Sequence, residues 1–416
     1  MKRAAAPATV AALAAALVLP SAAVFVACGG KEAPPAGAVS GPAEPAFSLL
    51  RASGRRIVNE SGEAIVLRGL NLGGWLVKEG YILHFPGTAL DAPSEIDRAL
   101  VDLAGAEGPR LLEEWREQWI GEADLAEIRS LGFNSVRLPL HYGLLWDAEH
   151  GTARPDGFAF LDRVVGWCES HRLWLFLDLH CAPGGQNAGN ISDSDGTARL
   201  YADLANQDAT VALWQAIAAR YRDRGAVIGG YDLLNEPVWQ PGRDVGRFFE
   251  RLARAVRAAD GRHAIVLEGN AWASDFSIFG EPFDDNLVYS FHKYWNANDE
   301  ASIAPYVAFA ERWRVPLWLG ETGENSNQWY RDALALVRRH EIGWCFWPWK
   351  KVWTDNDPLS VEPPAGSWER ISEYFEGKRP RPTPEEAAAA VRAMLQAAQV
   401  SRCKRNAEVI AILQAS

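Results

Sequence analysis

The sequence predicts a (β/α)8 barrel, in which eight parallel strands form a closed wall that helices surround. From about residue 57 onward, short apolar, β-branched runs alternate with longer segments of helical periodicity, and the runs number eight. The length of 416 residues alone would suit two or three domains. Barrels of this kind, however, often exceed about 200 residues as one domain.

Eight apolar runs are the expected strands: 65–70, 135–138, 173–179, 228–234, 264–267, 288–291, 316–319 and 343–347. Each is expected to be followed by a helix, for instance over 122–131, 162–171, 211–223, 245–259 and 329–340. The main alternative is an open, doubly wound sheet. That fold typically has a glycine-rich phosphate turn after its first strand, and Asn71-Leu72-Gly73-Gly74 does not match this pattern.

Two segments fall outside the barrel repeat. Residues 80–121 are too long for a simple loop and contain two helical patterns, 94–103 and 109–119. Long insertions after barrel strands usually shape the mouth of the site. Thr383 and Pro384 open an alanine-rich helix, and a shorter helix is expected near 406–413. We expect 381–416 to be a helical extension packed on a catalytic barrel that spans 47–380.

The first residues have the layout of a secretory signal. Lys2 and Arg3 precede an Ala/Leu/Val-rich run that ends near residue 27. A transmembrane anchor is the alternative, but alanine dominates the run and Pro7 and Pro20 interrupt it. We expect 1–27 to be a signal peptide. Residues 28–46, rich in Gly, Ala and Pro, are expected to form a flexible linker.

The signal ends in Phe25-Val26-Ala27-Cys28, which resembles a bacterial lipoprotein box. Ala27 fits the small residue before the cysteine, whereas Phe25 stands where leucine is usual. The resemblance implies that Cys28 is the lipid attachment site of an exported protein. Gly29 after it favours an outer-membrane or cell-surface address, with the lipid as the anchor. Without the lipid, the protein is expected in the periplasm or outside the cell.

The charge balance excludes some partners. The formal net charge is −11, and loss of Lys2 and Arg3 with the signal leaves −13 (−11 − 2). Without a long basic run, nucleic acid and anionic glycans are poor ligands, and a neutral substrate fits better. The 18 tryptophans exceed what a core usually needs, and their flat faces suit pyranose rings. We expect a monomer.

Four cysteines remain besides Cys28, namely Cys168, Cys181, Cys345 and Cys403. Export permits disulfides, and four cysteines allow three full pairings between which the sequence does not choose. Cys345 lies inside an apolar run, which favours a buried thiol.

Polar residues end most of the expected strands. The carboxyl ends of all strands in a parallel barrel face the active-site mouth. Arg137 lies on the second strand, and the later strand ends carry Asp178, His180, Asn235, Glu236, Glu268, His292, Tyr294, Glu321 and Trp347. This convergence indicates one catalytic site.

Two glutamates indicate the reaction. Glycoside cleavage needs one carboxyl group that protonates the leaving oxygen and a second that attacks or activates water. Glu236 and Glu321 end the fourth and seventh strands, which face each other across a barrel of eight. Side chains there can approach to about 5–5.5 Å, the separation of a retaining mechanism.

Other assignments of these residues stay open. Glu324 is a rival to Glu321, but it lies in the loop beyond the strand. Asp178 can serve an interior network alone. His180 and His292 could bind a metal, although a third ligand is not evident and no cofactor is expected.

The motifs together resemble glycoside hydrolase family 5, the cellulase-type family of retaining β-glycosidases, over about 56–378. The matching stretches are RGLNLGGW (68–75), GFNSVRLP (132–139), DLH (178–180), LNEP (234–237), HKY (292–294), GE (320–321) and FW (346–347). Two departures are Thr322, where an aromatic residue is common in the family, and Cys181.

The resemblance implies a role for each matching residue. Glu236 would be the acid/base and Glu321 the nucleophile. Arg137 and Tyr294 would hold the nucleophile, Asn235 would bind the sugar 2-hydroxyl, His180 and His292 would line the cleavage subsite, and Trp347 would be its sugar platform. Glu268 and Trp75 complete the set of binding or supporting residues.

Within the family, the stretches 71–76 (NLGGWL) and 182–187 (APGGQN) are similar to those of exo-β-1,3-glucanases and β-glucosidase-like members. A β-glucan or β-glucoside is therefore the expected substrate, cleaved in exo fashion. An endo-β-1,4-glucanase with an open cleft is the alternative. A non-catalytic, carbohydrate-binding surface lipoprotein would be expected to lack one of the glutamates or their supporting residues, and all are present.

Overall fold

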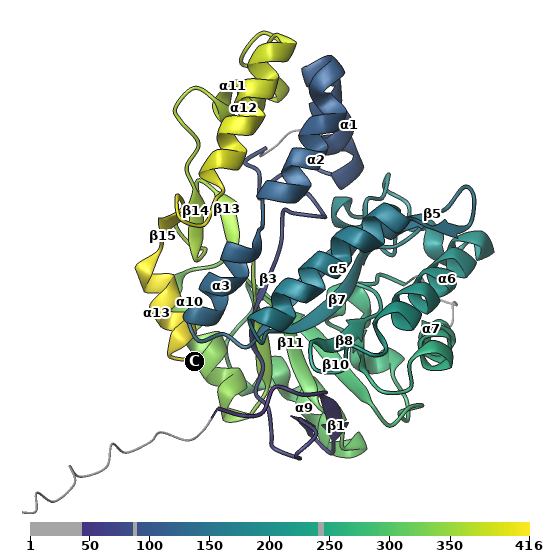
Figure 1. The fold of residues 1–416 in the computed structure, drawn as a ribbon. Helices are drawn as coiled ribbons and strands as arrows, with labels where there is room; N and C mark the ends of the chain where they lie inside the picture. The colour runs from purple at the N-terminus through teal and green to yellow at the C-terminus, as the bar shows by residue number, and fades with distance from the viewer. Residues whose placement is uncertain (1–43, 86–89, 240–244) are drawn as a thin grey trace, which may run out of the picture. The chain divides into compact units, whose positions relative to one another are not determined.

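The computed structural model describes residues 44–85, 90–239 and 245–416. The predicted signal peptide and Cys28 lie outside these residues. Within residues 45–416, eight parallel strands close into a barrel in chain order, which confirms the predicted fold class (Figure 1). The strands are β3 (Arg68–Asn71), β4 (Ser135–His141), β7 (Trp174–Cys181), β8 (Ile228–Asp232), β9 (Ala264–Glu268), β10 (Leu287–Lys293), β11 (Leu317–Gly323) and β12 (Gly343–Trp347).

Helices cover the outside of the barrel at most of the connections. They are α3 (Glu122–Ser130), α5 (Pro155–Ser170), α6 (Leu204–Tyr221), α7 (Val245–Ala259), α9 (Glu300–Trp313), α10 (Asn327–Arg339) and α11 (Trp368–Phe375). The expectation of a helix after each strand is wrong between β9 and β10. That connection holds only α8 (Asn270–Ala273) and a 3-10 turn (Phe276–Ile278). Positive φ angles at residues 271–273 stop a regular helix there.

Alternation along the strands sorts side chains into the barrel interior and the outer layer. An apolar cluster that includes Leu67, Phe176, Val266, Trp318 and Cys345 fills one part of the interior. The β1–β2 hairpin (Arg51–Ser53 and Arg56–Val58) contributes Ile57 to the same cluster. Alternation carries the same side on to Asp178 and His180 from Phe176 and to Glu268 from Val266, which are polar.

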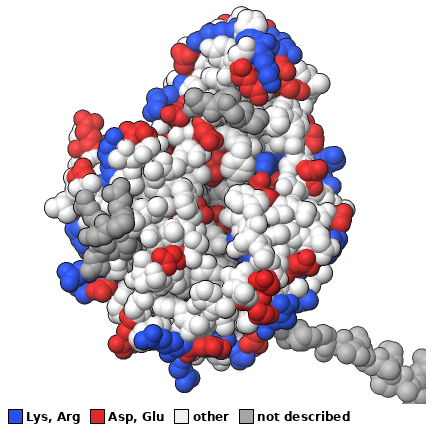
Figure 2. All heavy atoms as spheres, turned by 180° about the vertical axis from the view of Figure 1, so that it is seen from behind, with Lys and Arg blue, Asp and Glu red and all other residues white. Residues whose placement is uncertain are grey.

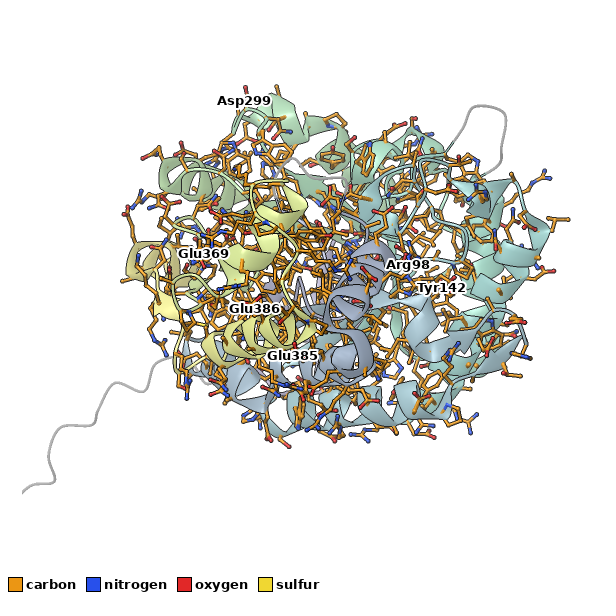
Figure 3. All side chains as sticks on the ribbon, turned by 90° about the horizontal axis from the view of Figure 1, so that it is seen from above. Arg98, Tyr142, Asp299, Glu369, Glu385 and Glu386 are labelled. Atoms are coloured by element: carbon orange, nitrogen blue, oxygen red, sulfur yellow. The ribbon has the colours of Figure 1, made fainter. Side chains whose placement is uncertain are left out.

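The insertion after β3 contains α1 (Pro93–Ala104) and α2 (Gly108–Gln118), close to the two predicted helical patterns. The C-terminal segment contains α12 (Pro384–Ala397) and α13 (Ala407–Gln414). Helix α12 packs on α1, α2 and α11, and α13 packs on α10. From above, α12 with Glu385 and Glu386 lies beside the insertion helices, where Arg98 is on α1 (Figure 3).

Lys350, which follows β12, forms a buried ion pair with Asp124 of α3 and a hydrogen bond with the C-terminal segment. The Nζ atom of Lys350 lies 2.6 Å from Oδ1 of Asp124 and 2.6 Å from the carbonyl oxygen of Ala398. Both side chains are almost fully buried. We propose, on these contacts, that 381–416 extends the barrel of residues 47–380 and is not a domain of its own.

Two further features concern the described residues only. The four cysteines there are buried free thiols, so none of the three possible pairings forms. No helix in this part of the chain has both the length and the apolar character that crossing a bilayer requires.

Candidate active site

A cavity of about 640 Å³ collects side chains from the ends of six barrel strands, or the loops that follow them, and from the insertion. Its lining includes Glu79, Tyr81, His180, Glu236, Trp272, His292, Tyr294, Trp295, Glu321, Glu324 and Trp347. Acidic atoms are also visible in a hollow near the middle of the face shown in Figure 2. The size is typical of a pocket that holds a small ligand.

Arg137 of β4 lies in the middle of a buried polar network. Its guanidinium group is fully buried and meets four carboxylates and two amides. The partners are Glu321 (2.6 Å), Asp232 (2.8 Å), Glu268 (2.8 Å), Asn235 (2.9 Å), Asn71 (3.1 Å) and Asp178 (3.2 Å). All the nitrogen donors of this arginine therefore have acceptors, which is what allows its burial.

One guanidinium cannot neutralise four buried carboxylates. Burial raises the pKa of Asp178, and burial together with the charge of Glu268 raises the pKa of Asp232 to about 8. Both shifts favour the neutral forms of these two aspartates, which would reduce the negative charge around the arginine.

Glu321 is turned into the cavity by an irregularity of its strand. Trp318 points into the barrel, so strict alternation would send residue 321 outward. The pairing of β11 with β12 shifts register between Leu319 and Thr322, and this shift re-aims the side chain. The Tyr294 hydroxyl donates to Oε2 of Glu321 at 2.9 Å. Burial and the charge of Glu321 raise the pKa of Tyr294, so it stays a donor.

Glu236 follows β8 in a turn with a φ of 44°. Its backbone N–H donates to Oε2 of Glu268 at 2.6 Å, and Asn187 donates to its carbonyl oxygen at 3.0 Å. These contacts hold an uncommon backbone conformation, which is a feature often found at functional sites. The side chain is thereby fixed with its carboxylate toward His292.

Glu236 and His292 form a buried hydrogen-bonded pair. Oε1 of Glu236 lies 2.8 Å from Nδ1 of His292. Burial alone would raise the pKa of Glu236, but the hydrogen bond and the charge of His292 hold it below its usual range. Burial would likewise lower the pKa of His292, yet Glu268 and Glu321 raise it well above its usual range. Both shifts favour an ion pair between the Glu236 carboxylate and a protonated His292.

The two glutamates stand close together. Carboxylate oxygens of Glu236 and Glu321 and a nitrogen of His292 all lie within 4.8 Å of one another. Inverting glycosidases keep their carboxyl groups about 6.5–9.5 Å apart, and retaining ones about 5–5.5 Å. The observed separation suits direct attack by one carboxylate, since it leaves no room for a water molecule between it and a sugar.

One wall of the cavity consists of aromatic rings that are held in place by hydrogen bonds. The ring centroids of His180 and Trp347 lie 5.4 Å apart, and the two ring planes are within 7° of parallel. Trp347 donates from Nε1 to the Tyr81 hydroxyl at 2.5 Å, and Asp178 lies 2.7 Å from Nδ1 of His180. Asn235 accepts from Arg137, so its amide nitrogen faces His180 at 3.3 Å. Asp178 therefore serves an interior network.

Four predicted residues lie outside the cavity lining, namely Arg137, Asn235, Glu268 and Trp75. Trp75 is buried, donates from Nε1 to the carbonyl oxygen of Arg116 at 2.8 Å and packs edge-on against Phe160. These contacts anchor the insertion, which fits a supporting role for Trp75, and its place in the predicted set stays a prediction. Glu268 lies beneath the cavity and links Arg137 to the backbone of Glu236.

Four residues in or beside the cavity were not predicted from the sequence. Asn71 and Asp232 are the polar last residues of strands that are mostly buried. A polar residue at the end of an apolar run was the signal that could have identified them. Glu79 and Tyr81 lie in the insertion, where no pattern marks them. Burial raises the pKa of Glu79 to about 8, although the charge of His180 opposes the shift.

Acidic groups in two places could in principle ligate a metal. Asp178, Asp232 and Glu268 form one group, but all three already contact the guanidinium of Arg137. Glu236, His292 and Glu321 form the other, and there the imidazole is engaged with a carboxylate. Independence from a cofactor stays a prediction.

The barrel and its pair of facing glutamates define a retaining β-glycoside hydrolase. The family model described as cellulase, glycosyl hydrolase family 5, matches residues 96–352. This match covers more than half of the chain. The chain belongs to glycosyl hydrolase family 5, as its motifs predict.

Curated relatives are O-glycosyl hydrolases of several kinds. The chain is 33% identical over 346 residues to a beta-xylosidase from Phanerodontia chrysosporium, covering 74% of this chain and 71% of that protein. It is 35% identical over 178 residues to a glucan 1,3-beta-glucosidase from Blumeria graminis, covering 41% of each. Among solved structures, an endogalactoceramidase aligns with a TM-score of 0.57 and 20% identity over 83% of this chain and 84% of that one. This last likeness shows the fold alone.

The shared proton predicts a pH effect. We expect activity to need one proton on the Glu236–His292 pair, and the raised pKa of His292 favours retention of that proton as the pH rises. In His292→Gln the proton must rest on a carboxyl group alone. We expect the basic limb of the kcat/KM profile to move to lower pH by about one unit or more.

The matched control is His141→Gln, whose imidazole pairs with Asp193 and does not line this cavity. Coincident basic limbs for wild type and His292→Gln would contradict the assignment.

Proposed function

We propose that the protein is an exo-acting retaining hydrolase of β-glucans or β-glucosides, with Glu321 as the nucleophile and Glu236 as the acid/base. The main support for this proposal is that carboxylate oxygens of Glu236 and Glu321 lie within 4.8 Å of each other and line one cavity. Arg137 donates to Oε1 of Glu321 and Tyr294 donates to Oε2, so the carboxylate is held in one orientation. Glu236 has the imidazole of His292 as its proton source.

The first step forms a covalent glycosyl-enzyme. An oxygen of Glu321 attacks the anomeric carbon, and the bond from that carbon to the leaving oxygen breaks. Glu236 gives its proton to the leaving oxygen, after receiving it from His292 across their hydrogen bond. In the second step Glu236 takes a proton from water, whose oxygen displaces Glu321 and releases the sugar.

The glycone sugar is proposed to lie between the parallel His180–Trp347 pair and Asn235. Trp347 offers a flat face, and the Asn235 amide nitrogen, oriented by Arg137, can donate to a sugar hydroxyl. Glu79 adds an acceptor, because its Oε1 is buried without a hydrogen-bond partner among the described residues. Such an oxygen is stabilised when a ligand hydroxyl donates to it.

Exo action is supported by the walls of the cavity. The insertion places Glu79 and Tyr81 beside the glycone residues, where an open cleft would need to continue. The glucan 1,3-beta-glucosidase relative is named for release of glucose, and the beta-xylosidase relative makes a β-xyloside the second candidate glycone. A non-catalytic binding role is disfavoured because both glutamates are present and each contacts its supporting residues. Arg137 and Tyr294 contact Glu321, and His292 contacts Glu236.

Alanine variants test the two glutamates. Glu321→Ala should lower hydrolysis by about 10⁴-fold, since no carboxylate remains to form the intermediate. Glu236→Ala should lose about 10²–10⁴-fold on alkyl glycosides, but aryl glycosides with good leaving groups should keep a partly active first step. Burst kinetics and steady-state rates measure this.

The control for both variants is Glu385→Ala, an exposed glutamate of α12 (Figure 3). Circular dichroism should show an intact fold in all three variants. Activity near that of wild type in Glu321→Ala would end the assignment.

Product sizes test exo action. With β-1,3-, β-1,4- and β-1,6-glucans and aryl β-glucosides and β-xylosides, early products should be monosaccharide only, because the insertion closes the glycone side. Chromatography of samples taken over time measures this. Early oligosaccharides from a β-1,4-glucan would instead support the endo-β-1,4-glucanase alternative.

Export is a further proposal. The lipoprotein-like segment before Cys28 supports an outer-membrane or surface location through a lipid on that cysteine. Mass spectrometry of the membrane fraction should find an acylated Cys28. A soluble mature protein that starts at another residue would contradict this.

A further inference from the structure

Glu268, the last residue of β9, is completely buried and does not line the cavity. It can therefore act on a bound sugar only through other residues. The pairing of the strands decides which residues these are. Glu268 pairs with Ser290 of β10, two residues before His292, and β9 also pairs with β8, after which Glu236 lies. A carboxylate in this position lies between the two members of the acid/base pair.

Three nitrogen donors converge on the two carboxylate oxygens of Glu268. Oε2 accepts from the backbone N–H of Glu236 at 2.6 Å. Oε1 accepts from Nη2 of Arg137 at 2.8 Å and lies 3.2 Å from Nε2 of His292. The backbone of the acid/base residue and the imidazole beside it thus contact one and the same buried side chain.

The contact with Glu236 stabilises a backbone conformation that is unfavourable for a residue with a side chain. The φ of Glu236 is 44°, and its N–H donates to a charged acceptor, which makes the hydrogen bond a strong one. Without that acceptor the N–H would be left unsatisfied. The turn would then lose a contact that directs the carboxylate of Glu236 toward its place beside the cavity.

The contact with His292 fixes the direction of the imidazole. Its Nδ1 lies 2.8 Å from Oε1 of Glu236, and its Nε2 faces Glu268 on the opposite side of the ring. Burial opposes a protonated imidazole, and the negative charge of Glu268 comes first among the interactions that raise the pKa of His292. Glu268 therefore acts on both the orientation and the charge of the ring.

The nucleophile is held by other donors. Oε1 of Glu321 accepts from Nη1 of Arg137, and Oε2 accepts from the Tyr294 hydroxyl. The contact of Arg137 with Glu268 uses a different nitrogen, Nη2. A change at Glu268 should therefore impair proton transfer by Glu236 more than attack by Glu321.

We infer that Glu268 is a positioning residue for the acid/base, which holds the turn of Glu236 through one oxygen and the imidazole of His292 through the other. This inference rests on the proposed function, in which Glu236 moves the proton. It applies to both steps, because the same carboxyl group protonates the leaving oxygen and later takes a proton from water. Glu268 itself neither contacts the sugar nor transfers a proton.

The test is Glu268→Gln, read through two β-glucosides. The glutamine keeps the shape but offers one acceptor oxygen, and its amide nitrogen is a donor that must face at least one of the three donors. Dinitrophenolate leaves with little protonation, so the kcat/KM ratio of an alkyl to a dinitrophenyl β-glucoside isolates the acid function. We expect this ratio to fall by about 30-fold, a part of the roughly 10²–10⁴-fold that general acid catalysis contributes.

Added azide gives a second readout, on the step in which Glu236 acts as a base. Azide bonds to the anomeric carbon as the bond to Glu321 breaks, and it has no proton to lose. With saturating dinitrophenyl β-glucoside, azide should raise kcat of Glu268→Gln and yield β-glucosyl azide. Wild type should continue to release glucose at an unchanged rate.

Asp124→Asn is the matched control. Asp124 is also a buried carboxylate with three donors, which are the N–H of Gly121, Nε1 of Trp349 and Nζ of Lys350, but it does not line the cavity. This variant should lower the melting temperature and leave both readouts as in wild type.

Glu268→Asp keeps the negative charge but is one methylene too short to retain both contacts. We expect it to lower the ratio by about fivefold, the size of one lost hydrogen bond. It provides the test if Glu268→Gln does not fold, which circular dichroism shows.

An unchanged ratio in a folded Glu268 variant would overturn the positioning role. An equal loss on both glucosides, or the same fall in Asp124→Asn, would also overturn it, because these results indicate a structural role only. Glu236→Ala separates this failure from failure of the proposed function, since its ratio must fall whatever Glu268 does. If wild type cleaves only β-xylosides, the same ratio is measured with the alkyl and dinitrophenyl β-xylosides.

Discussion

The buried guanidinium of Arg137 is the interaction on which the rest of the site depends. It contacts side chains from five other strands or their ends, including Asp232, Glu268 and Glu321. A charge that is completely removed from water must have partners on all its donors, so the surrounding strands are held at one spacing. Orientation of Asn235 follows from the same contact. The same buried guanidinium therefore both positions the site residues and supplies the positive charge beside Glu321.

The barrel supplies what this arginine needs. Alternation places Phe176 and Asp178 on the same side of β7, with the apolar residue in the interior cluster and the polar one among the network. The shift between β11 and β12 departs from this alternation and turns Glu321 toward the arginine. A bulge at a reacting residue is a common way to re-aim a side chain without changing the fold.

Division of charge gives the two glutamates different properties. Glu321 has the arginine and a tyrosine hydroxyl, whereas Glu236 has only the imidazole of His292 and the backbone support from Glu268. Burial raises the pKa values of Asp178 and Asp232, which favours their neutral forms beside Arg137. The walls of the same cavity differ in exposure, since Trp347 is almost fully buried and Trp295 is mostly exposed.

The sequence by itself determined the barrel, the eight strands and the residues at their ends, because a period of two and a polar residue after an apolar run are local properties. Contacts between distant segments were decided only by the tertiary structure. Trp75 lies in a matching motif but anchors the insertion, while Glu79 comes from a segment with no periodic signal and enters the cavity. The register shift at Glu321 depends on pairing with β12, and the connection after β9 depends on its backbone angles. Neither of these is encoded in the spacing of apolar residues along one strand.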